Sequence, residues 1–399
     1  MTLDVEAGLL PEHQELVATV RRFAREEVAP VIAGYYEREE FPYPLVEKMG
    51  AMGLFGLPFP EEYGGMGGDY MALCLALEEL ARVDSSVAIT LEAGVGLGAM
   101  PIFRFGTEEQ RRRWLPDLCA GRALGAFGLT EPGGGSDAGA TRTTARRDGD
   151  EWVLNGSKAF ITNSGTQITS LVTVTAVTSD SVLDGDGAAA GARARHISAI
   201  VVPAGTEGFS VAPAYSKVGW NASDTHELFF SDCRVPADHL LGEEGRGYAQ
   251  FLSILDEGRV ALAALSVGLA QGCVDECVRY LGEREAFGHK LGESQVLQFK
   301  VADMEARTHV ARLACYDAAR RLVAGRPFKR EAAIAKLVSS EAAMANAREA
   351  TQIFGGYGFV NETPVARFYR DAKVLEIGEG TSEVQRMVIA RQLGLPASP

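Results

Sequence analysis

The stretch 369–391, which reads YRDAKVLEIGEGTSEVQRMVIAR, places one acidic residue, Glu379, between two glycines. Thr381 is suited to cap a following helix, and Glu383 suits the positive end of its dipole. The apolar positions of that helix recur at helical spacing, at Val384, Met387, Val388 and Leu393. Glycines let the chain bend sharply and let another molecule approach. On this stretch alone, a surface glutamate in a capping loop is the favoured interpretation, and the rest of the chain reverses it.

The composition limits the classes of function. A chain of 399 residues predicts two or three substructures, and 46% hydrophobic residues suffice for large cores. The net charge of −14 argues against nucleic-acid and anionic-membrane partners. We expect no apolar run long enough to span a bilayer. The N-terminal residues MTLDVEAGLLPEHQ lack a signal or transit pattern, so we expect a cytoplasmic protein.

The cysteines and histidines predict neither disulfides nor a metal site. Cys273 and Cys277 share a helix face, but no further ligand lies near them. The histidines form no ligand-spaced pair. We expect the cysteines to be small buried hydrophobes in a reducing compartment, at positions 74, 119, 233, 273, 277 and 315.

The hydrophobic period changes twice along the chain and predicts three domains. Residues 1–123 are helical, with an amphipathic helix at 11–28, a buried helix at 71–83 and a capping box at Thr107 and Gln110. The glycines at 94, 96 and 98 follow no strand, so we expect close helix packing there. Residues 124–240 predict an antiparallel β domain, and residues 241–399 predict a four-helix bundle.

Within the β domain, Asn155-Gly156 separates two apolar runs and predicts a hairpin turn. Further strands are expected at 171–177 and 197–202, as in a sandwich or barrel. The segment between them, 179–196, is rich in Gly, Ala and Asp and predicts an exposed mobile loop. The helical period then returns at 247–283, 293–324, 330–354 and 381–394.

Two polar strings predict a ligand site. In GLTEPGGGSDAGA, residues 128–140, bare backbone amides and the hydroxyls of Thr130 and Ser136 suit a planar ligand with polar edges. In the second, Phe160 and Thr162 lie two apart and point to one face of a strand, where they suit a ring system. Taken alone, a core phenylalanine and an edge threonine are the favoured interpretation.

Two further strings lie in the C-terminal half. Arg284, Phe287 and Gly288, with Gln295 following, alone resemble the end of a helix. The string QIFGGYGFVNETPVARFYRD, residues 352–371, leads directly into the stretch that contains Glu379. Its arginines and Asp371 suit a structural ion-pair network.

Together these strings resemble the two sequence signatures of the acyl-CoA dehydrogenase family, over nearly the whole chain. The matching positions include Gly128-Leu129-Thr130-Glu131, Gly135-Ser136-Asp137, Gln352, Gly355-Gly356, Gly358-Phe359, Glu362, Arg367 and Asp371. The resemblance implies FAD as cofactor and an N-terminal helical domain, a middle β domain and a C-terminal helical bundle. It implies cofactor contacts from Thr130, Ser136, Phe160, Thr162, Arg284, Phe287, Gln295, Gln352, Gly355, Gly356, Thr381 and Glu383. Phe160 stands where relatives often carry Trp.

The resemblance also implies the reaction, an α,β-dehydrogenation of an acyl-CoA thioester in which Glu379 removes the α-proton. A glutamate kept from water has its pKa raised toward neutrality, which suits that task. Substrate contacts are implied for Ser136, Arg259, Glu379 and Gly380. The implied partners are an electron-transfer flavoprotein and further copies of the chain in a homotetramer, because part of the FAD site crosses between subunits.

Two departures from the family bear on the base and the substrate. One branch of the family carries its base on the helix before Arg259, but that position is Gly258 here, and Glu257 points away. Straight-chain members commonly have Tyr where this chain has Gly378. Without that ring the acyl pocket would be wider, which predicts that the enzyme accepts branched, longer or bulkier acyl groups.

Two alternatives remain at this point. An oxidase or oxygenase on the same fold would pass electrons to oxygen, although the presence of Glu379 favours a dehydrogenase. A helical metal carrier would need repeated Glu-x-x-His pairs. The nearest pattern is Glu305 and His309, which are four apart and unrepeated.

Overall fold

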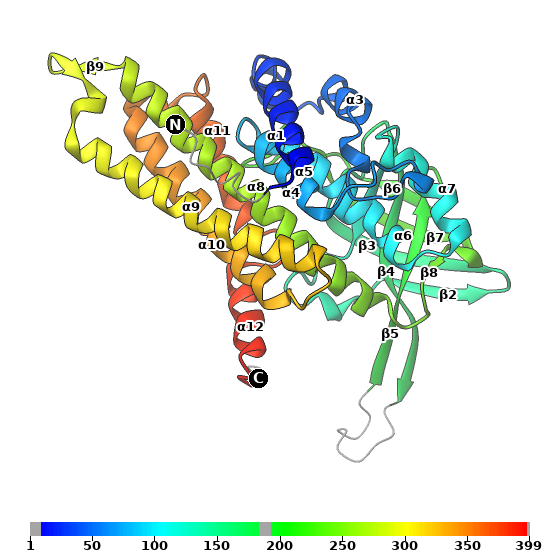
Figure 1. Cartoon of the computed structure of the whole chain (residues 1–399). Coiled ribbons are helices and arrows are strands. Elements are labelled where there is room, and N and C mark those ends of the chain that lie inside the picture. Colours follow the sequence, from blue (N-terminus) through cyan, green and yellow to red (C-terminus); the bar gives the residue numbers. More distant parts are fainter. Residues whose placement is uncertain (1–8, 183–192, 397–399) are drawn as a thin grey trace.

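The computed structural model describes residues 9–182 and 193–396, and their order is helical, then β, then helical (Figure 1). The helices are α1 Pro11–Phe23, α2 Ile32–Glu37, α3 Tyr43–Ala51, α4 Tyr70–Ala81, α5 Ser85–Glu92, α6 Met100–Phe105, α7 Glu108–Cys119, α8 Gly247–Glu283, α9 Gln295–Val323, α10 Lys329–Phe354, α11 Pro364–Leu375 and α12 Ser382–Gln392. The strands are β1 Leu124–Gly128, β2 Thr144–Asp148, β3 Glu151–Thr162, β4 Thr169–Val182, β5 Arg193–Pro203, β6 Phe209–Val211, β7 Thr225–Pro236, β8 Leu240–Leu241, β9 Glu285–Ala286 and β10 His289–Lys290.

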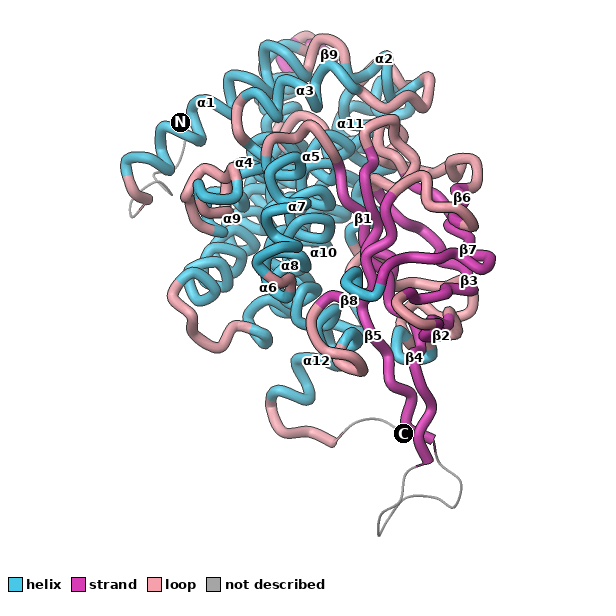
Figure 2. The backbone as a smooth tube through the Cα atoms, turned by 90° about the vertical axis from the view of Figure 1, so that its right-hand side faces the viewer, coloured by secondary structure: helices cyan, strands magenta, loops and turns pink. Residues whose placement is uncertain are grey.

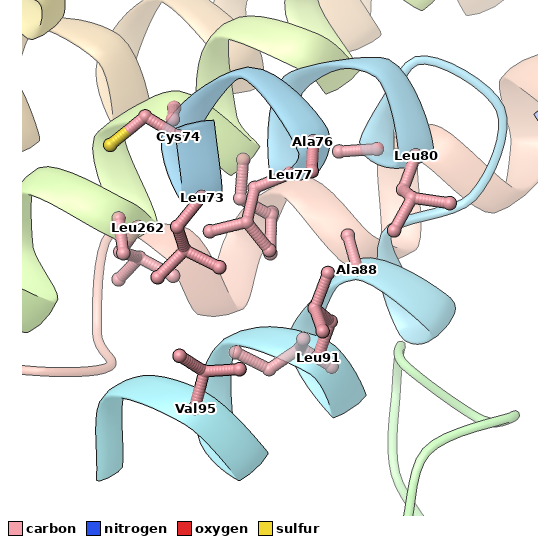
Figure 3. Close-up of a cluster of buried hydrophobic side chains, with 14 of the residues drawn as sticks. Leu73, Cys74, Ala76, Leu77, Leu80, Ala88, Leu91, Val95 and Leu262 are labelled. Atoms are coloured by element: carbon pink, nitrogen blue, oxygen red, sulfur yellow. The ribbon is translucent and has the colours of Figure 1, made fainter. Parts of the chain in front are cut away.

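The N-terminal helices enclose α4, all of whose residues are buried, as its all-round apolar sequence predicts. Asp69 caps α4, and the capping box expected at Thr107 and Gln110 is confirmed at the start of α7. Figure 3 shows side chains of α4 directed toward Leu91 and Val95, with Leu262 of α8 beside them. The segment Ala93–Ala99 continues α5 as a π-helix, packed against β1.

The glycines of that π-helix allow the close packing expected from the sequence. A Cβ at Gly98 would lie 2.5 Å from the carbonyl oxygen of Gly125 in β1, and one at Gly94 would lie 2.9 Å from the ring of Phe55. The helix that carries Glu92 is therefore pressed between α4 and the sheet.

The middle domain is one sheet on the side of the molecule opposite most of the helices (Figure 2), with strand order β6-β7-β3-β2-β4-β5-β8. Most neighbours are antiparallel, but β1 and β2 both pair with β4 in parallel, so the sheet is mixed. Strands β4 and β5 pair out to Val182 and Arg193, so the ends of the segment expected as a loop are strands. Residues 183–192 lie outside the described part.

The hairpin turn expected at Asn155-Gly156 is wrong. Strand β3 runs straight through these residues, and the turn between β2 and β3 lies at 149–150, where Gly149 has φ +62°. Gly156 instead marks a break in register between β3 and β7. A Cβ there would lie 2.5 Å from Oγ1 of Thr143, so the glycine serves a bulge and a close approach.

The C-terminal helices α8, α9 and α10 lie side by side, and α11 and α12 pack against α10 (Figure 1). Helix α11 was missed in the sequence, where the string 352–371 drew attention for its glycines and its ion-pair network and not for a helical period. Asp371 on α11 accepts hydrogen bonds from Tyr36 Oη at 2.6 Å, Ser85 Oγ at 2.7 Å and the backbone N–H of Trp220 at 2.7 Å. One buried carboxylate therefore joins all three parts of the chain.

Within residues 9–182 and 193–396, two helical segments are, contrary to expectation, long and apolar enough to cross a membrane by length and composition, Ser85–Phe105 and Gly247–Glu283. In each, 89% of the apolar window is buried inside the structure. Core helices of soluble proteins pass the same test, and both segments pack against α4 and one another.

Candidate active site

Glu379 lies in a tight turn between α11 and α12. Its own φ is +52° and that of Gly380 is +93°, a region that costs a non-glycine residue about 1–3 kcal/mol. The turn is held from inside the protein, because Lys336 Nζ donates to the Gly380 carbonyl at 2.8 Å and Gln385 Nε2 donates to the carbonyls of Glu379 and Gly380 at 3.2 and 2.8 Å. Thr381 caps α12 through its side chain, as predicted.

The carboxyl group of Glu379 is buried, although other parts of the residue are exposed. Neither carboxyl oxygen accepts a hydrogen bond from any described N–H or O–H group. The carboxyl lies over α8, where a Cβ on Gly258 would come within 2.2 Å of Oε2. Burial raises the pKa of Glu379 to about 7, although the positive charges of Lys336 and Arg259 oppose the shift.

Glu257 does point away from this carboxyl. It forms a two-point ion pair with Arg104 of α6, with both N–O distances at 3.0 Å. Arg259 is 4% exposed and pairs with Asp256 at 2.5 Å. It lies close enough to Glu379 to influence its charge, and its contact with substrate stays a prediction.

A buried ion pair between Lys158 and Glu131 holds the base of the loop that contains Thr130 and Ser136. Lys158 of β3 is 0% exposed, and its Nζ lies 2.7 Å from Glu131 Oε1. The same Glu131 carboxylate accepts the backbone N–H groups of residues 142 and 143 at 2.7 and 3.0 Å. A Cβ added to Gly139 would lie 3.5 Å from the ring of Tyr248, at the start of α8. The loop is therefore fixed at its base and leaves Ser136 exposed at its tip.

Phe160 and Thr162 come from the end of β3. Phe160 has φ +60° and a side chain that is 65% exposed, stacked on Tyr215 with ring centroids 5.1 Å apart. Its neighbour Ala159 donates to the carbonyl of Thr130 at 2.9 Å. After Thr162, the side chain of Asn163 donates to the carbonyl of Thr90 on α5 at 3.0 Å. Hydrogen bonds of the neighbouring residues thus connect Phe160 and Thr162, the two predicted cofactor contacts, to the loop of Thr130 and to the helix of Glu92.

A second group of predicted residues lies at the other end of α8. Arg284 follows this helix and stacks over Tyr357 with its guanidinium 5.7 Å from the ring centroid. Phe287 lies in the projecting β9–β10 hairpin and is 96% exposed (Figure 1). Gln295 and Gln352 are exposed, at the start of α9 and near the end of α10. An added Cβ at Gly355 or Gly356 would meet no atom within 4 Å.

The predicted cofactor residues therefore do not form one site within a single chain. Gly258, which contacts Glu379, and Arg284 are separated by 26 residues of one helix, or about 39 Å at 1.5 Å per residue. The first end of this helix is the one near Gly258 and Glu379, and it is the end beside Thr130, Ser136, Phe160 and Thr162. Thr381 and Glu383 also belong there, at the start of α12, where its own backbone N–H and the Thr381 hydroxyl lower the pKa of Glu383.

Both ends fit parts of a flavin dinucleotide. At the first end, an exposed aromatic ring, hydroxyls and a buried carboxylate without a donor suit a redox-active ring and the carbon it oxidises. At the second end, open glycine backbone beside Arg284 suits close approach of an anionic group.

Three residues of the site were missed in the sequence: Glu92, Lys336 and Gln385. Glu92 is an isolated polar residue in an apolar helical segment, and that signal could have marked it as a buried group with a task. Lys336 and Gln385 lie in helices with many other polar residues and carry no such signal. Glu92 is 0% exposed, faces Glu379, and has a pKa raised well above its usual range by burial and by that second carboxyl. The expected burial of the cysteines is confirmed, since all six are free and buried.

Three family models cover the chain. Residues 10–122 match the acyl-CoA dehydrogenase N-terminal domain, residues 126–233 the middle domain and residues 245–394 the C-terminal domain. Among curated relatives, a probable acyl-CoA dehydrogenase of Bacillus subtilis is 46% identical, with 96% of this chain and 98% of that protein covered. The human mitochondrial short-chain specific acyl-CoA dehydrogenase is 44% identical, with 96% and 90% covered.

Solved structures agree. The butyryl-CoA dehydrogenase of Megasphaera elsdenii superimposes with a TM-score of 0.90 at 41% identity, covering 96% of this chain and 98% of that one. A glutaryl-CoA dehydrogenase of Mycobacterium smegmatis in complex with FADH2 gives 0.91 at 32% identity, covering 99% and 97%. A chain in the structure of the electron transferring flavoprotein of Acidaminococcus fermentans gives 0.91 at 41% identity, covering 98% and 99%.

Proposed function

The chain belongs to the acyl-CoA dehydrogenase family, and we propose that Glu379 is the base that removes the α-proton of its substrate. The enzyme is an FAD-dependent oxidoreductase that acts on the CH–CH bond of an acyl-CoA thioester. The observation that supports the base is its carboxyl group, which is buried and accepts no hydrogen bond from a backbone, hydroxyl, amide or cationic donor among the described residues.

The surroundings of Glu379 supply what proton abstraction needs. An α-proton is weakly acidic, so the base works best with a pKa near the working pH, and burial brings the pKa of Glu379 to about 7. The turn fixes the carboxyl against Gly258, while the backbone N–H of Glu379, which makes no hydrogen bond to a described residue, is free to hold the thioester oxygen as charge develops there. When bound, FAD supplies the acceptor for the β-hydrogen.

Anaerobic reduction of the bound flavin by a thioester tests the base. Glu379→Gln keeps the shape of the side chain and removes its basicity, so we expect flavin bleaching to slow by about 10²–10⁴-fold. Glu376→Gln is the matched control, because Glu376 lies three residues before Glu379 and its carboxylate pairs with Lys373 at 2.7 Å. Unchanged bleaching in the Glu379 variant would overturn the assignment.

We further propose that the FAD site is completed by a second subunit, within a homotetramer built as a dimer of dimers. The support is the separation of about 39 Å along α8 between the two groups of cofactor residues. Exposed apolar side chains at the far end support an interface there, with Phe287 at 96%, Phe359 at 92% and Phe299 at 60% exposure. Ser136 and Arg259 remain proposed substrate contacts.

The oligomer proposal predicts that a change at the interface lowers flavin content and oligomer size together. Phe287→Ser should lower flavin content and shift the mass measured by light scattering toward smaller species. Leu313→Ser, a change of an equally apolar exposed residue on α9, is a control for surface hydrophobicity alone. A monomer with full flavin content in the unaltered protein would contradict the proposal.

For the substrate, we propose a short acyl chain with room for a branch beside Gly378. The short chain is supported by the relatives at 42–44% identity that are named short-chain specific. The branch is supported by the space at Gly378, where an added Cβ would meet only the carbonyl oxygen of Val374, at 3.5 Å.

An electron-transfer flavoprotein is the acceptor typical of the family, and we propose it as the partner here, in a cytoplasmic setting. A stopped-flow measurement of reoxidation by such a flavoprotein and by air tests this choice. Faster reoxidation by air would favour an oxidase.

We also propose that the domain boundaries lie between residues 123 and 124 and between residues 240 and 241.

A further inference from the structure

We propose that Glu92 is a positioning residue that stays protonated and donates a hydrogen bond to the carboxylate of Glu379, so that two buried carboxyl groups share one proton before substrate binds. This inference rests on the proposed role of Glu379 and adds a second residue, from a different part of the chain, that prepares the base.

The geometry requires a proton between the two groups. The Glu92 side chain is 0% exposed, and none of the four carboxyl oxygens of Glu92 and Glu379 accepts a hydrogen bond from a described N–H or O–H group. The two carboxyls lie within hydrogen-bonding reach of each other. Two ionised carboxylates cannot form a hydrogen bond and would repel, so one of them carries a proton.

The surrounding charges decide which carboxyl holds the proton. Around Glu379, Lys336 of α10 and Arg259 of α8 both favour the ionised form. Around Glu92, burial and the Glu379 carboxyl both favour the protonated form, and no cation among the described residues opposes them. Glu92 is therefore the acid of the pair and Glu379 the carboxylate.

The other polar groups nearby do not change that order. The buried hydroxyl of Tyr70, on α4, makes no hydrogen bond to a described residue. It lies near Glu92, because a Cβ added to Gly96 would be 3.7 Å from the Tyr70 hydroxyl and 2.9 Å from Glu92 Oε1. Glu257 of α8 is neutralised by Arg104 of α6. Asp256, beside Arg259, is shared between Arg259 and Lys329.

Glu92 also sits on a rigid support. Leu91 and Val95, on either side of it in sequence, pack toward α4 (Figure 3). Asn163 of the sheet domain holds the carbonyl of Thr90 at 3.0 Å. A hydrogen bond to an ionised carboxylate lowers its pKa, so this donor keeps Glu379 ready to accept a proton at neutral pH.

The pH dependence of kcat/KM for the holoenzyme tests the proposal, since its acid limb reports the base in the free enzyme. Glu92→Leu removes the donor, and we expect the acid limb to move up by about one pH unit, with kcat/KM about tenfold lower below it. Glu92→Gln keeps an N–H donor and should move the limb much less. Ser86→Ala, at another buried polar residue of α5, is the control and should leave the limb in place.

Each other outcome overturns the proposal. An unmoved limb in Glu92→Leu would mean that Glu92 only fills space. A downward shift in both variants would mean that Glu92 is ionised and repels the base.

Infrared difference spectroscopy gives a readout that is independent of activity and usable if the leucine variant folds poorly. The unaltered holoenzyme should show a protonated-carboxylic-acid C=O band at pH 7 that Glu92→Gln lacks. If the band persists in Glu92→Gln, the proton lies elsewhere and the proposal fails. If Glu379→Gln remains active while the band is lost in Glu92→Gln, the base assignment fails and the buried acid at Glu92 stands.

Discussion

Lys336 of α10 donates from Nζ to the carbonyl oxygen of Gly380 at 2.8 Å, so a buried cation supports the turn that presents Glu379. Lys336 is 0% exposed, and burial lowers its pKa to about 8. Its positive charge favours the ionised form of Glu379. One side chain thus fixes both the backbone and the charge of the proposed base.

Replacement of Lys336 by Met should raise the pKa of Glu379, because the carboxylate loses its neighbouring cation. We expect the acid limb of the kcat/KM profile to rise by about one pH unit and the rate at pH 6 to fall by about tenfold. The control is Lys373→Met, since Lys373 is an exposed lysine paired with Glu376 at 2.7 Å. An identical profile for the two variants would show that the Lys336 charge does not reach the base.

Gly258→Ala should displace the Glu379 carboxyl, because the added Cβ would lie 2.2 Å from Oε2. A displacement of about 1 Å can cost about a hundredfold in rate, so we expect kcat to fall by ten- to a hundredfold while flavin content is kept. Gly282→Ala is the matched control on the same helix, where an added Cβ meets no atom within 4 Å. Equal kcat values for the two variants would mean that the carboxyl moves aside freely.

The domain order and the long C-terminal helices could be predicted from sequence, because hydrophobic period reports local burial. The 65% exposure of Phe160 could not, since a phenylalanine in a strand is more often part of the core. The turn at Gly149 could not, since Asn155-Gly156 carries the stronger local signal and only the pairing of β3 with β7 makes it a bulge. Local patterns do not report pairing between distant strands.

The site was predictable only in part for a related reason. Glu379 was marked by its own flanking glycines, but its partners come from helices far away in sequence. Glu92 lies 287 positions before it and Lys336 lies 43 positions before it. Nothing in either local sequence specifies which carboxyl or carbonyl it will meet, so tertiary packing alone brings them together.

Gly378→Tyr should narrow the pocket beside the base. The nearest atom to an added Cβ is the Val374 carbonyl oxygen at 3.5 Å, so the backbone accepts a side chain there. The ring would compete with a branched acyl group, and one methyl group in such a pocket is worth about 1–3 kcal/mol. We expect kcat/KM for isobutyryl-CoA to fall at least about tenfold relative to butyryl-CoA, with Gly378→Ala in between. If the ratio of the two substrates is already the same in all three proteins, Gly378 does not set the preference.

Asp371→Asn should change how stability depends on pH. Burial raises the pKa of Asp371 from 3.8 to about 6, so the folded protein binds this proton more tightly than the unfolded chain. The stabilisation by this group is therefore fully present below about pH 4 and lost as the pH rises through about 6. Relative to the asparagine variant, the unaltered protein should lose up to about 3 kcal/mol of unfolding free energy across that window, as measured by urea denaturation.

Tyr36→Phe supplies the matched comparison, because the Tyr36 hydroxyl donates to Asp371 at 2.6 Å and favours its ionised form. Without that donor, the pKa of Asp371 should rise further, and the loss of stability should extend to higher pH than in the unaltered protein. Asp371→Asn combined with Tyr36→Phe should show neither slope. A pH slope that survives in Asp371→Asn would assign the titration to another group, and an unshifted slope in Tyr36→Phe would show that the hydroxyl does not stabilise the carboxylate.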